Sequence, residues 1–149
     1  MGNITPYLRV RNAAEAIEFY KKAFDAREEY QLRDPRGRVG HAEITIHGSL
    51  LQISDEFPDF RIVGPESIGG TTVAIHLQVV DVDTVFEQAF AAGASVVAPV
   101  QDQFFGERTG SLLDPFGHHW IISTTIEELS PQEMQVRYSL QFIPDESQE

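Results

Sequence analysis

The sequence repeats itself at a constant offset of 69 residues, and this repeat limits the possible folds more than any other feature. The residues that coincide at this offset are Leu8 with Leu77, Val10 with Val79, Gly48 with Gly117, Ile53 with Ile122, and Ser54 with Ser123. Because one offset holds at both ends of the repeated unit, it indicates a duplicated module rather than a chance match of short apolar segments.

Each half of the chain predicts the order strand, helix, strand, strand, strand. Alternating residues and turn signals predict strands over residues 4–10, 26–33, 39–46 and 49–54, and again over 73–79, 95–100, 106–113 and 119–124. Helices are expected over 13–24, after the cap residue Asn12, and over 81–92, before Gly93. The predicted fold class is therefore α+β, with two tandem βαβββ modules whose curved mixed sheets surround a cleft, and with a C-terminal helix.

We expect a single domain over residues 1–149. Its parts are a first module at 4–54, a linker loop at 55–70 rich in proline and glycine, a second module at 71–125 and a C-terminal extension at 126–143.

Ser130-Pro131-Gln132-Glu133 predicts the start of the C-terminal helix. In the simpler account, its apolar residues Met134, Val136 and Leu140 pack onto the chain's own sheet, and in the other account they form a surface for a partner. The tail from Pro144 onward is polar and is expected to be loose.

Composition excludes several classes of site and partner. The chain has no cysteine, so disulfides, thiolate metal sites and cysteine nucleophiles are excluded, and a reducing, cytoplasmic location is expected. The net charge of −12 repels nucleic acid and anionic membranes, and no apolar stretch approaches the ~20 residues of a membrane helix. The expected partner is therefore a small-molecule ligand, with no nucleic acid and no membrane.

Strand alternation divides the side chains between two faces of each sheet. The apolar face, expected beneath the helices, comprises Leu8, Val10, Ala42, Ile44, Ile46, Leu51, Ile53, Ile75, Leu77, Val79, Trp120 and Ile122. The opposite face comprises Thr5, Tyr7, Arg9, His41, Glu43, Thr45, Gln52, Ser54, Ala74, His76, Gln78, His119, Ile121 and Ser123. Two such polar faces, if curved toward each other, line a cleft for a ligand.

Several motifs carry a family resemblance. The order of elements, Asp81-Val82-Asp83, Ala92-Gly93-Ala94 and above all the Asp-Pro-Phe-Gly-His-His-Trp run at 114–120 resemble the vicinal oxygen chelate superfamily. This group includes glyoxalase I, extradiol dioxygenases, fosfomycin-resistance transferases and bleomycin-resistance proteins. Residues 101–108 and 129–131 are similar to its PhnB-like branch. The resemblance covers roughly residues 4 to 137, and it implies a homodimer whose sites are shaped by both chains.

The same resemblance locates the superfamily's divalent metal. Its four ligand positions fall at Thr5, Gln52, Ala74 and Ile121. Only Gln52 is a usual ligand type there, since alanine and isoleucine have no donor atom and threonine is a poor neutral ligand. We therefore expect no cofactor at these positions, although a displaced site could still hold a divalent metal.

Polar and aromatic residues of the expected cleft are the candidate site residues. The catalytic candidates are Glu43, as a general base, and His76, which lies two residues beyond Ala74 and could hold a displaced metal with help from His41 or Glu43. The candidate ligand-binding residues are Tyr7, Arg9, His41, Gln52, Gln78, Phe104, Phe105, Arg108 and His119.

Bland interpretations stand beside these roles. Glu43 is also explained by an ion pair with Arg9 or another arginine, which is the interpretation we favour, and Arg9 equally suits a ligand carboxylate or phosphonate. Phe104 and Phe105, with Arg108, either close over a planar ligand or seal a dimer interface. Trp120 belongs to the apolar face and His118 to the turn, so both are expected to be structural.

The favoured function is metal-free binding of a small molecule, as in bleomycin-resistance relatives. The alternative is a lyase, isomerase or dioxygenase-type enzyme with a displaced metal around His76 and Glu43, or with metal-free acid–base chemistry. If the chain is an enzyme, a glyoxalase-like lyase or isomerase is expected.

Overall fold

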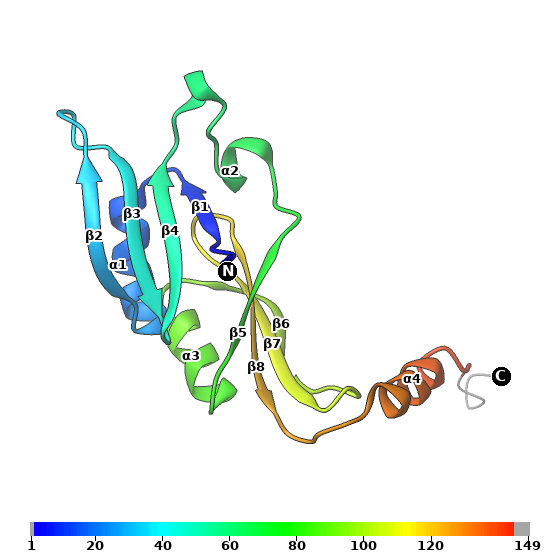
Figure 1. Ribbon diagram of the computed structural model, residues 1–149. Helices are drawn as coiled ribbons and strands as arrows, with labels where there is room; N and C mark the ends of the chain where they lie inside the picture. Colours follow the sequence, from blue (N-terminus) through cyan, green and yellow to red (C-terminus); the bar gives the residue numbers. More distant parts are fainter. Residues whose placement is uncertain (1, 145–149) are drawn as a thin grey trace.

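The computed structural model describes residues 2–144, so the tail beyond Pro144 lies outside the described residues. Two four-stranded mixed sheets form the body of the molecule (Figure 1). The first has the order β1-β4-β3-β2, from β1 (Tyr7–Val10), β2 (Arg27–Arg33), β3 (Val39–Ile46) and β4 (Ser49–Asp55). The second has the order β5-β8-β7-β6, from β5 (Ala74–Gln78), β6 (Ser95–Asp102), β7 (Glu107–Leu113) and β8 (His119–Thr125). The predicted α+β class and the duplicated βαβββ order are confirmed.

The duplication extends to the pairing of single residues. The first strand of each module pairs in parallel with the last, and Tyr7 lies opposite Gln52 just as His76 lies opposite Ile121. Both partners in the second pair lie 69 residues beyond their counterparts in the first. The offset read from the sequence is therefore also the structural equivalence of the two sheets.

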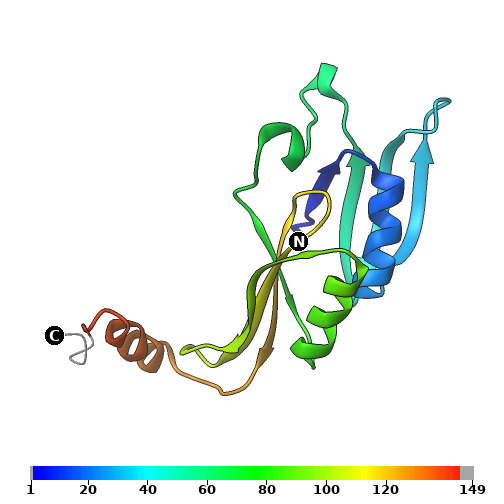
Figure 2. The ribbon, with the colours of Figure 1, turned by 180° about the vertical axis from the view of Figure 1, so that it is seen from behind.

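Helices α1 (Ala13–Phe24) and α3 (Val82–Ala92) cover the apolar faces of the sheets. Asn12 and Asp81 cap their first turns, each by accepting a backbone N–H bond three residues on. The two helices contact each other, so both modules share one core (Figure 2). Most of the predicted apolar face is buried in it, including Trp120, and Ile75 and Val79 are partly buried.

One buried carboxylate fixes the turn between β7 and β8 and links it to the first module. Asp114 accepts hydrogen bonds from the backbone N–H groups of Phe116 (2.9 Å) and His118 (3.0 Å). It also accepts bonds from Trp120 Nε1 (2.9 Å) and from the hydroxyl of Tyr20 on α1 (2.5 Å). Burial, and then the charge of Asp114, raise the pKa of Tyr20 well above its usual value. The hydroxyl therefore stays protonated and keeps donating to Asp114.

The segment between the modules contains two short helical turns, η1 (Pro58–Phe60) and α2 (Pro65–Ile68). It packs closely on the first strand, because a Cβ atom added at Gly64 would lie 2.6 Å from the carbonyl oxygen of Arg9. The predicted linker is therefore a wall of the molecule as well as a connection.

Helix α4 (Pro131–Leu140) begins at the predicted capping residue, with Ser130 accepting a bond from the N–H of Glu133 at 3.1 Å. The helix projects from the end of the second sheet, and none of its residues is buried (Figure 1). The expectation that it packs onto the chain's own sheet is wrong. Among the described residues, no helix is long and apolar enough to cross a membrane.

Candidate ligand-binding site

One row of polar side chains crosses the whole first sheet. Residue pairing places Tyr7 beside Gln52, Gln52 beside Glu43, and Glu43 beside Tyr30. We call these four residues, which come from β1, β4, β3 and β2 in turn, the first-sheet row. The sequence predicted three of them.

The first-sheet row is joined by hydrogen bonds and by His41. The Tyr7 hydroxyl lies 2.6 Å from His41 Nδ1, and His41 Nε2 lies 3.6 Å from Glu43 Oε1. Gln52 donates to Glu43 at 3.4 Å. Burial raises the pKa of Tyr30, and its hydrogen bond with Glu43 raises it further. The row therefore forms a connected polar surface that offers both donors and acceptors.

The favoured ion pair between Glu43 and Arg9 does not form among the described residues. Arg9 donates instead to Ser54 Oγ at 2.6 Å, and its guanidinium carbon lies 3.9 Å from the centre of the Tyr7 ring. Glu43 is turned toward His41 and Gln52, because these flank it on its own strand and on the neighbouring strand. The carboxylate and the guanidinium thus take separate partners.

The equivalent row on the second sheet is less polar. Pairing places His76 beside Ile121, Ile121 beside Ser111, and Ser111 beside Ala98, and we call these the second-sheet row. All four line a cavity of about 360 Å³. Its other lining residues are Gln103, Phe105, Glu107, Thr109, Gly110 and His119.

His76 and Gln78 both turn toward the second module's own polar groups. His76 Nε2 lies 2.7 Å from Ser123 Oγ and 4.0 Å from Glu107 Oε2. Gln78 donates to Glu107 at 3.4 Å. Glu107, rather than Glu43, is therefore the carboxylate that accompanies His76, and the two catalytic candidates belong to different clusters.

The aromatic pair before β7 is divided between two surroundings. Phe105 lines the second-sheet cavity, whereas the ring of Phe104 packs 5.8 Å from that of Tyr138 on α4. Arg108 pairs with Asp83 at 2.9 Å and with Asp102 at 3.0 Å, and these bonds raise its pKa above its usual value. Its guanidinium is thus already occupied by two carboxylates, while Phe105 is placed to contact a ligand.

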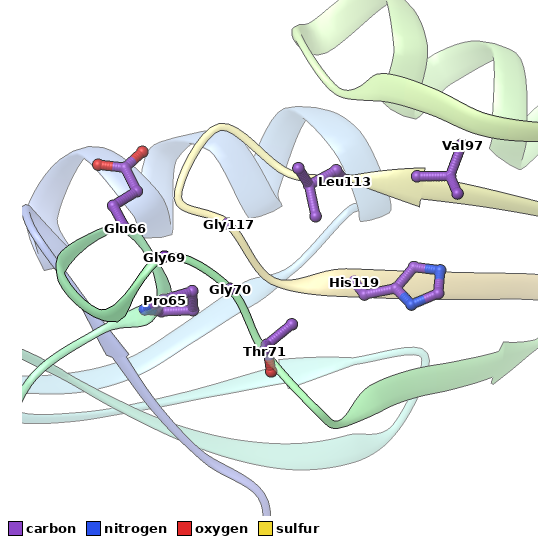
Figure 3. A pocket seen from close by; sticks show the side chains of 9 residues that line it. All are labelled: Pro65, Glu66, Gly69, Gly70, Thr71, Val97, Leu113, Gly117 and His119. Atoms are coloured by element: carbon purple, nitrogen blue, oxygen red, sulfur yellow. The ribbon is translucent and has the colours of Figure 1, made fainter.

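A further cavity, of about 400 Å³, opens between the linker and the β7–β8 turn (Figure 3). Pro65 and Thr71 face it from the linker side, and Leu113 and His119 face it from the strands. The Nε2 atom of His119 is buried and has no hydrogen-bond partner within residues 2–144. Sequence reasoning identified His119 but missed the linker, because proline and glycine there signalled only a loop.

The four superfamily metal positions do not suit a metal in this chain. Gln52 and Ile121 take equivalent places in the two rows, while Thr5 precedes β1 and Ala74 opens β5. Two of the four side chains have no donor atom. Within the described part of the chain, no three His, Asp or Glu side chains gather in a way that could hold a metal ion. The donor set therefore does not fit the divalent ion.

Sequence reasoning also left Tyr30 and Glu107 out of the site. An irregularity in pairing between Glu28 and Tyr30 shifts the register of β2, so the face of Tyr30 cannot be read from simple alternation. Glu107 is the first residue of β7, where the predicted strand boundary was one residue away. A two-residue periodicity carries no information at such positions.

The comparisons agree with this architecture. Residues 2–122 match the Glyoxalase/Bleomycin resistance protein/Dioxygenase superfamily. The chain belongs to this family. The resemblance inferred from the sequence is thereby confirmed.

Relatives share both sequence and fold. The Mycobacterium tuberculosis protein Rv0887c is 43% identical over 141 residues, covering 93% of this chain and 83% of that protein. The crystal structure of PA1353 from Pseudomonas aeruginosa is 25% identical with a TM-score of 0.68, covering 84% of this chain and 98% of that one. A PhnB protein from Bacillus cereus, 22% identical with a TM-score of 0.67 and coverages of 83% and 100%, shares the fold.

Proposed function

We propose that this protein binds a small organic molecule on the polar faces of its sheets, without the divalent metal typical of the superfamily. The observation that carries this proposal is the donor set at the four metal positions, where Ala74 and Ile121 have no ligating atom. The polar rows and cavities of about 360–400 Å³ support it, because binding sites for small molecules combine an apolar wall with a few placed polar groups. The absence of cysteine suits action in the reducing cytoplasm.

Metal analysis of protein purified without chelator or histidine tag tests the metal-free part of the proposal. We expect less than about 0.1 equivalent of any divalent ion per chain, and no thermal stabilisation by added zinc or nickel. One equivalent of a divalent ion that is lost in His76→Ala would refute it and favour a displaced site at His76.

Thermal-shift screening with planar aromatic and anionic compounds tests the binding itself. A true ligand should raise the melting temperature in a concentration-dependent way, since it binds the folded state alone. The stabilisation should fall in the double variant Glu43→Gln, His76→Ala. If it survives there unchanged, the ligand binds elsewhere and the assignment of the site is wrong.

We further propose that the protein acts as a homodimer whose sites are shaped by both chains. Helix α4 supports this, because Val136 and Leu140 lie one turn apart on it and are 61% and 55% exposed. A second copy of the chain would cover this apolar arm. Light scattering should show a dimer, and Val136→Ser with Leu140→Ser should yield monomers, whereas Gln135→Ser on the same helix should not. A dissociated variant that retains full ligand affinity contradicts shared sites.

An acid–base enzyme is the second candidate function, favoured by the chain of contacts from Tyr7 through His41 to Glu43. If His41 donates Nε2–H to the carboxylate, its Nδ1 atom can accept the Tyr7 proton, so Tyr7 can exchange a proton with a bound substrate. In that case Tyr7→Phe should abolish turnover but retain binding. Equal loss of both would leave Tyr7 a binding residue.

A further inference from the structure

Arg9 differs from every other basic residue in the described part of the chain. Six of the eleven lysines and arginines form ion pairs with carboxylates, namely Arg11, Lys21, Arg27, Arg38, Arg108 and Arg137. Four more have no such pair and are exposed, namely Lys22, Arg33, Arg36 and Arg61. Within residues 2–144, only Arg9 is both half-buried and without an ion pair. In a chain of net charge −12, this lone cation marks a place for a negative charge supplied from outside.

The guanidinium of Arg9 is held in place before any ligand arrives. Tyr7 stacks beneath it at 3.9 Å, and Ser54 accepts one N–H bond at 2.6 Å while donating its own proton to the carbonyl of Asp55. A guanidinium has five N–H donors, so the edges not facing Ser54 remain free for a planar acceptor. A group fixed in this way loses little side-chain entropy when it binds an anion.

A cavity of about 370 Å³ adjoins Arg9 at the free edge of β1, and we call it the β1-edge cavity. Its wall is mainly apolar, and the polar groups are few. The residues that line it are Pro6, Tyr7, Leu8, Arg9, Val63, Gly64, Pro65, Ile68, Gly70, Thr71, Val73, Ile75 and His118. His118 Nε2 is already bonded to the carbonyl of Arg9 at 3.0 Å, which leaves the guanidinium as the charged group of the cavity.

We propose that Arg9 binds the carboxylate of a small amphiphilic monocarboxylate, whose aromatic or aliphatic body lies in the β1-edge cavity. This inference rests on the proposed small-molecule function and assigns the chemical class of its ligand. The planar fork of arginine matches the two oxygens of a carboxylate. One cation neutralises one negative charge, so a dianionic phosphate would leave a charge uncompensated here. The apolar wall gives the body of the ligand a surface to bury.

Two matched pairs of probes test the class by calorimetry: benzoate against benzamide, and hexanoate against hexanamide. Each pair keeps shape and size while removing the charge. We expect each carboxylate to bind wild-type protein at least about tenfold more tightly than its amide. Arg9→Gln should abolish this preference and Arg9→Lys should reduce it, because lysine keeps the charge but loses the fork. Arg33→Gln removes the same charge from an exposed, unpaired arginine and should change nothing.

The outcomes separate this inference from the function on which it rests. If amides bind as tightly as carboxylates, or if Arg9→Gln retains the preference, Arg9 is not the anion site, although ligand binding as such stands. If inorganic phosphate competes more strongly than benzoate, the carboxylate class is wrong. If neither carboxylates nor amides bind, and the wider thermal-shift screen finds no ligand, both proposals fail. Circular dichroism of each variant, with Arg9→Lys as the conservative form, distinguishes lost binding from lost folding.

Discussion

Replacing Asp114 by asparagine tests whether this one carboxylate holds the two modules together. One of its oxygens accepts from the N–H groups of Phe116 and His118 at 2.9 and 3.0 Å. The other accepts from Tyr20 and Trp120 at 2.5 and 2.9 Å. All four partners are donors, and asparagine has the same shape but offers only one acceptor atom.

The cost follows from counting donors. If the amide oxygen of the substituted side chain faces the backbone, its NH₂ group faces Tyr20 and Trp120. The Tyr20 hydroxyl can rotate and accept, but the indole N–H of Trp120 cannot, and Trp120 is only 1% exposed. A buried donor without a partner costs about 1–3 kcal/mol, and a lost charge-assisted bond adds to this. We therefore expect Asp114→Asn to lower the free energy of unfolding by about 3 kcal/mol, which corresponds to roughly 10 °C in melting temperature.

The first module supplies an internal control for this prediction. Asp34 begins the turn Asp34-Pro35-Arg36-Gly37, which has the same Asp-Pro-x-Gly pattern, and it accepts bonds from the N–H groups of Arg36 and Arg38. These bonds are exposed, so water replaces them, and Asp34→Asn should cost less than about 1 kcal/mol. Urea unfolding of both variants at one fixed protein concentration measures the difference. Equal costs for the two substitutions would show that the buried donors of Tyr20 and Trp120 do not matter.

The remaining predictions concern titration, close packing and the second-sheet cavity. Because the pKa of Tyr20 is raised in the folded protein, only the unfolded chain ionises it above about pH 10, so stability should fall with rising pH there. Urea unfolding between pH 9 and 11, on the order of one pH unit either side of that value, should show a shallower fall for Tyr20→Phe. Gly64→Ala should cost about 1–3 kcal/mol by thermal unfolding, because its Cβ would lie 2.6 Å from the carbonyl oxygen of Arg9, and the exposed Gly40→Ala should cost less. Phe105→Ala should weaken any ligand of the second-sheet cavity by about tenfold in calorimetry, whereas Phe104→Ala should leave that affinity unchanged.

Much of the fold was predictable because the signals were local or repeated. Strand β3 and helix α1 have the predicted bounds, and α4 begins at the predicted Pro131. The offset of 69 also gave the equivalence of Gln52 and Ile121, which the pairing of the two sheets reproduces. Alternation, capping residues and a duplicated pattern all act over short separations, so a single sequence carries them.

The partners within the site were not predictable in the same way. Alternation placed Arg9 and Glu43 on one face, but it did not say that Arg9 would bond Ser54 and Glu43 would adjoin His41. Those choices depend on strand order and register, which place β4 between β1 and β3. The position of α4 was missed for another reason: the exposed Val136 and Leu140 look like core residues in a sequence, although no part of the described chain covers them.

The differences between the modules, rather than the repeat, determine how the modules are joined. The β3–β4 turn has the two residues His47 and Gly48, whereas the β7–β8 turn runs from Asp114 to His118. That longer turn carries both contacts to the first module: Asp114 binds Tyr20, and His118 binds the carbonyl of Arg9. Because the same turn packs against the backbone of Arg9, the contact that joins the modules also positions the cation proposed to bind the ligand. A change in this turn should therefore alter stability and anion affinity together, while a change in the β3–β4 turn should alter neither contact.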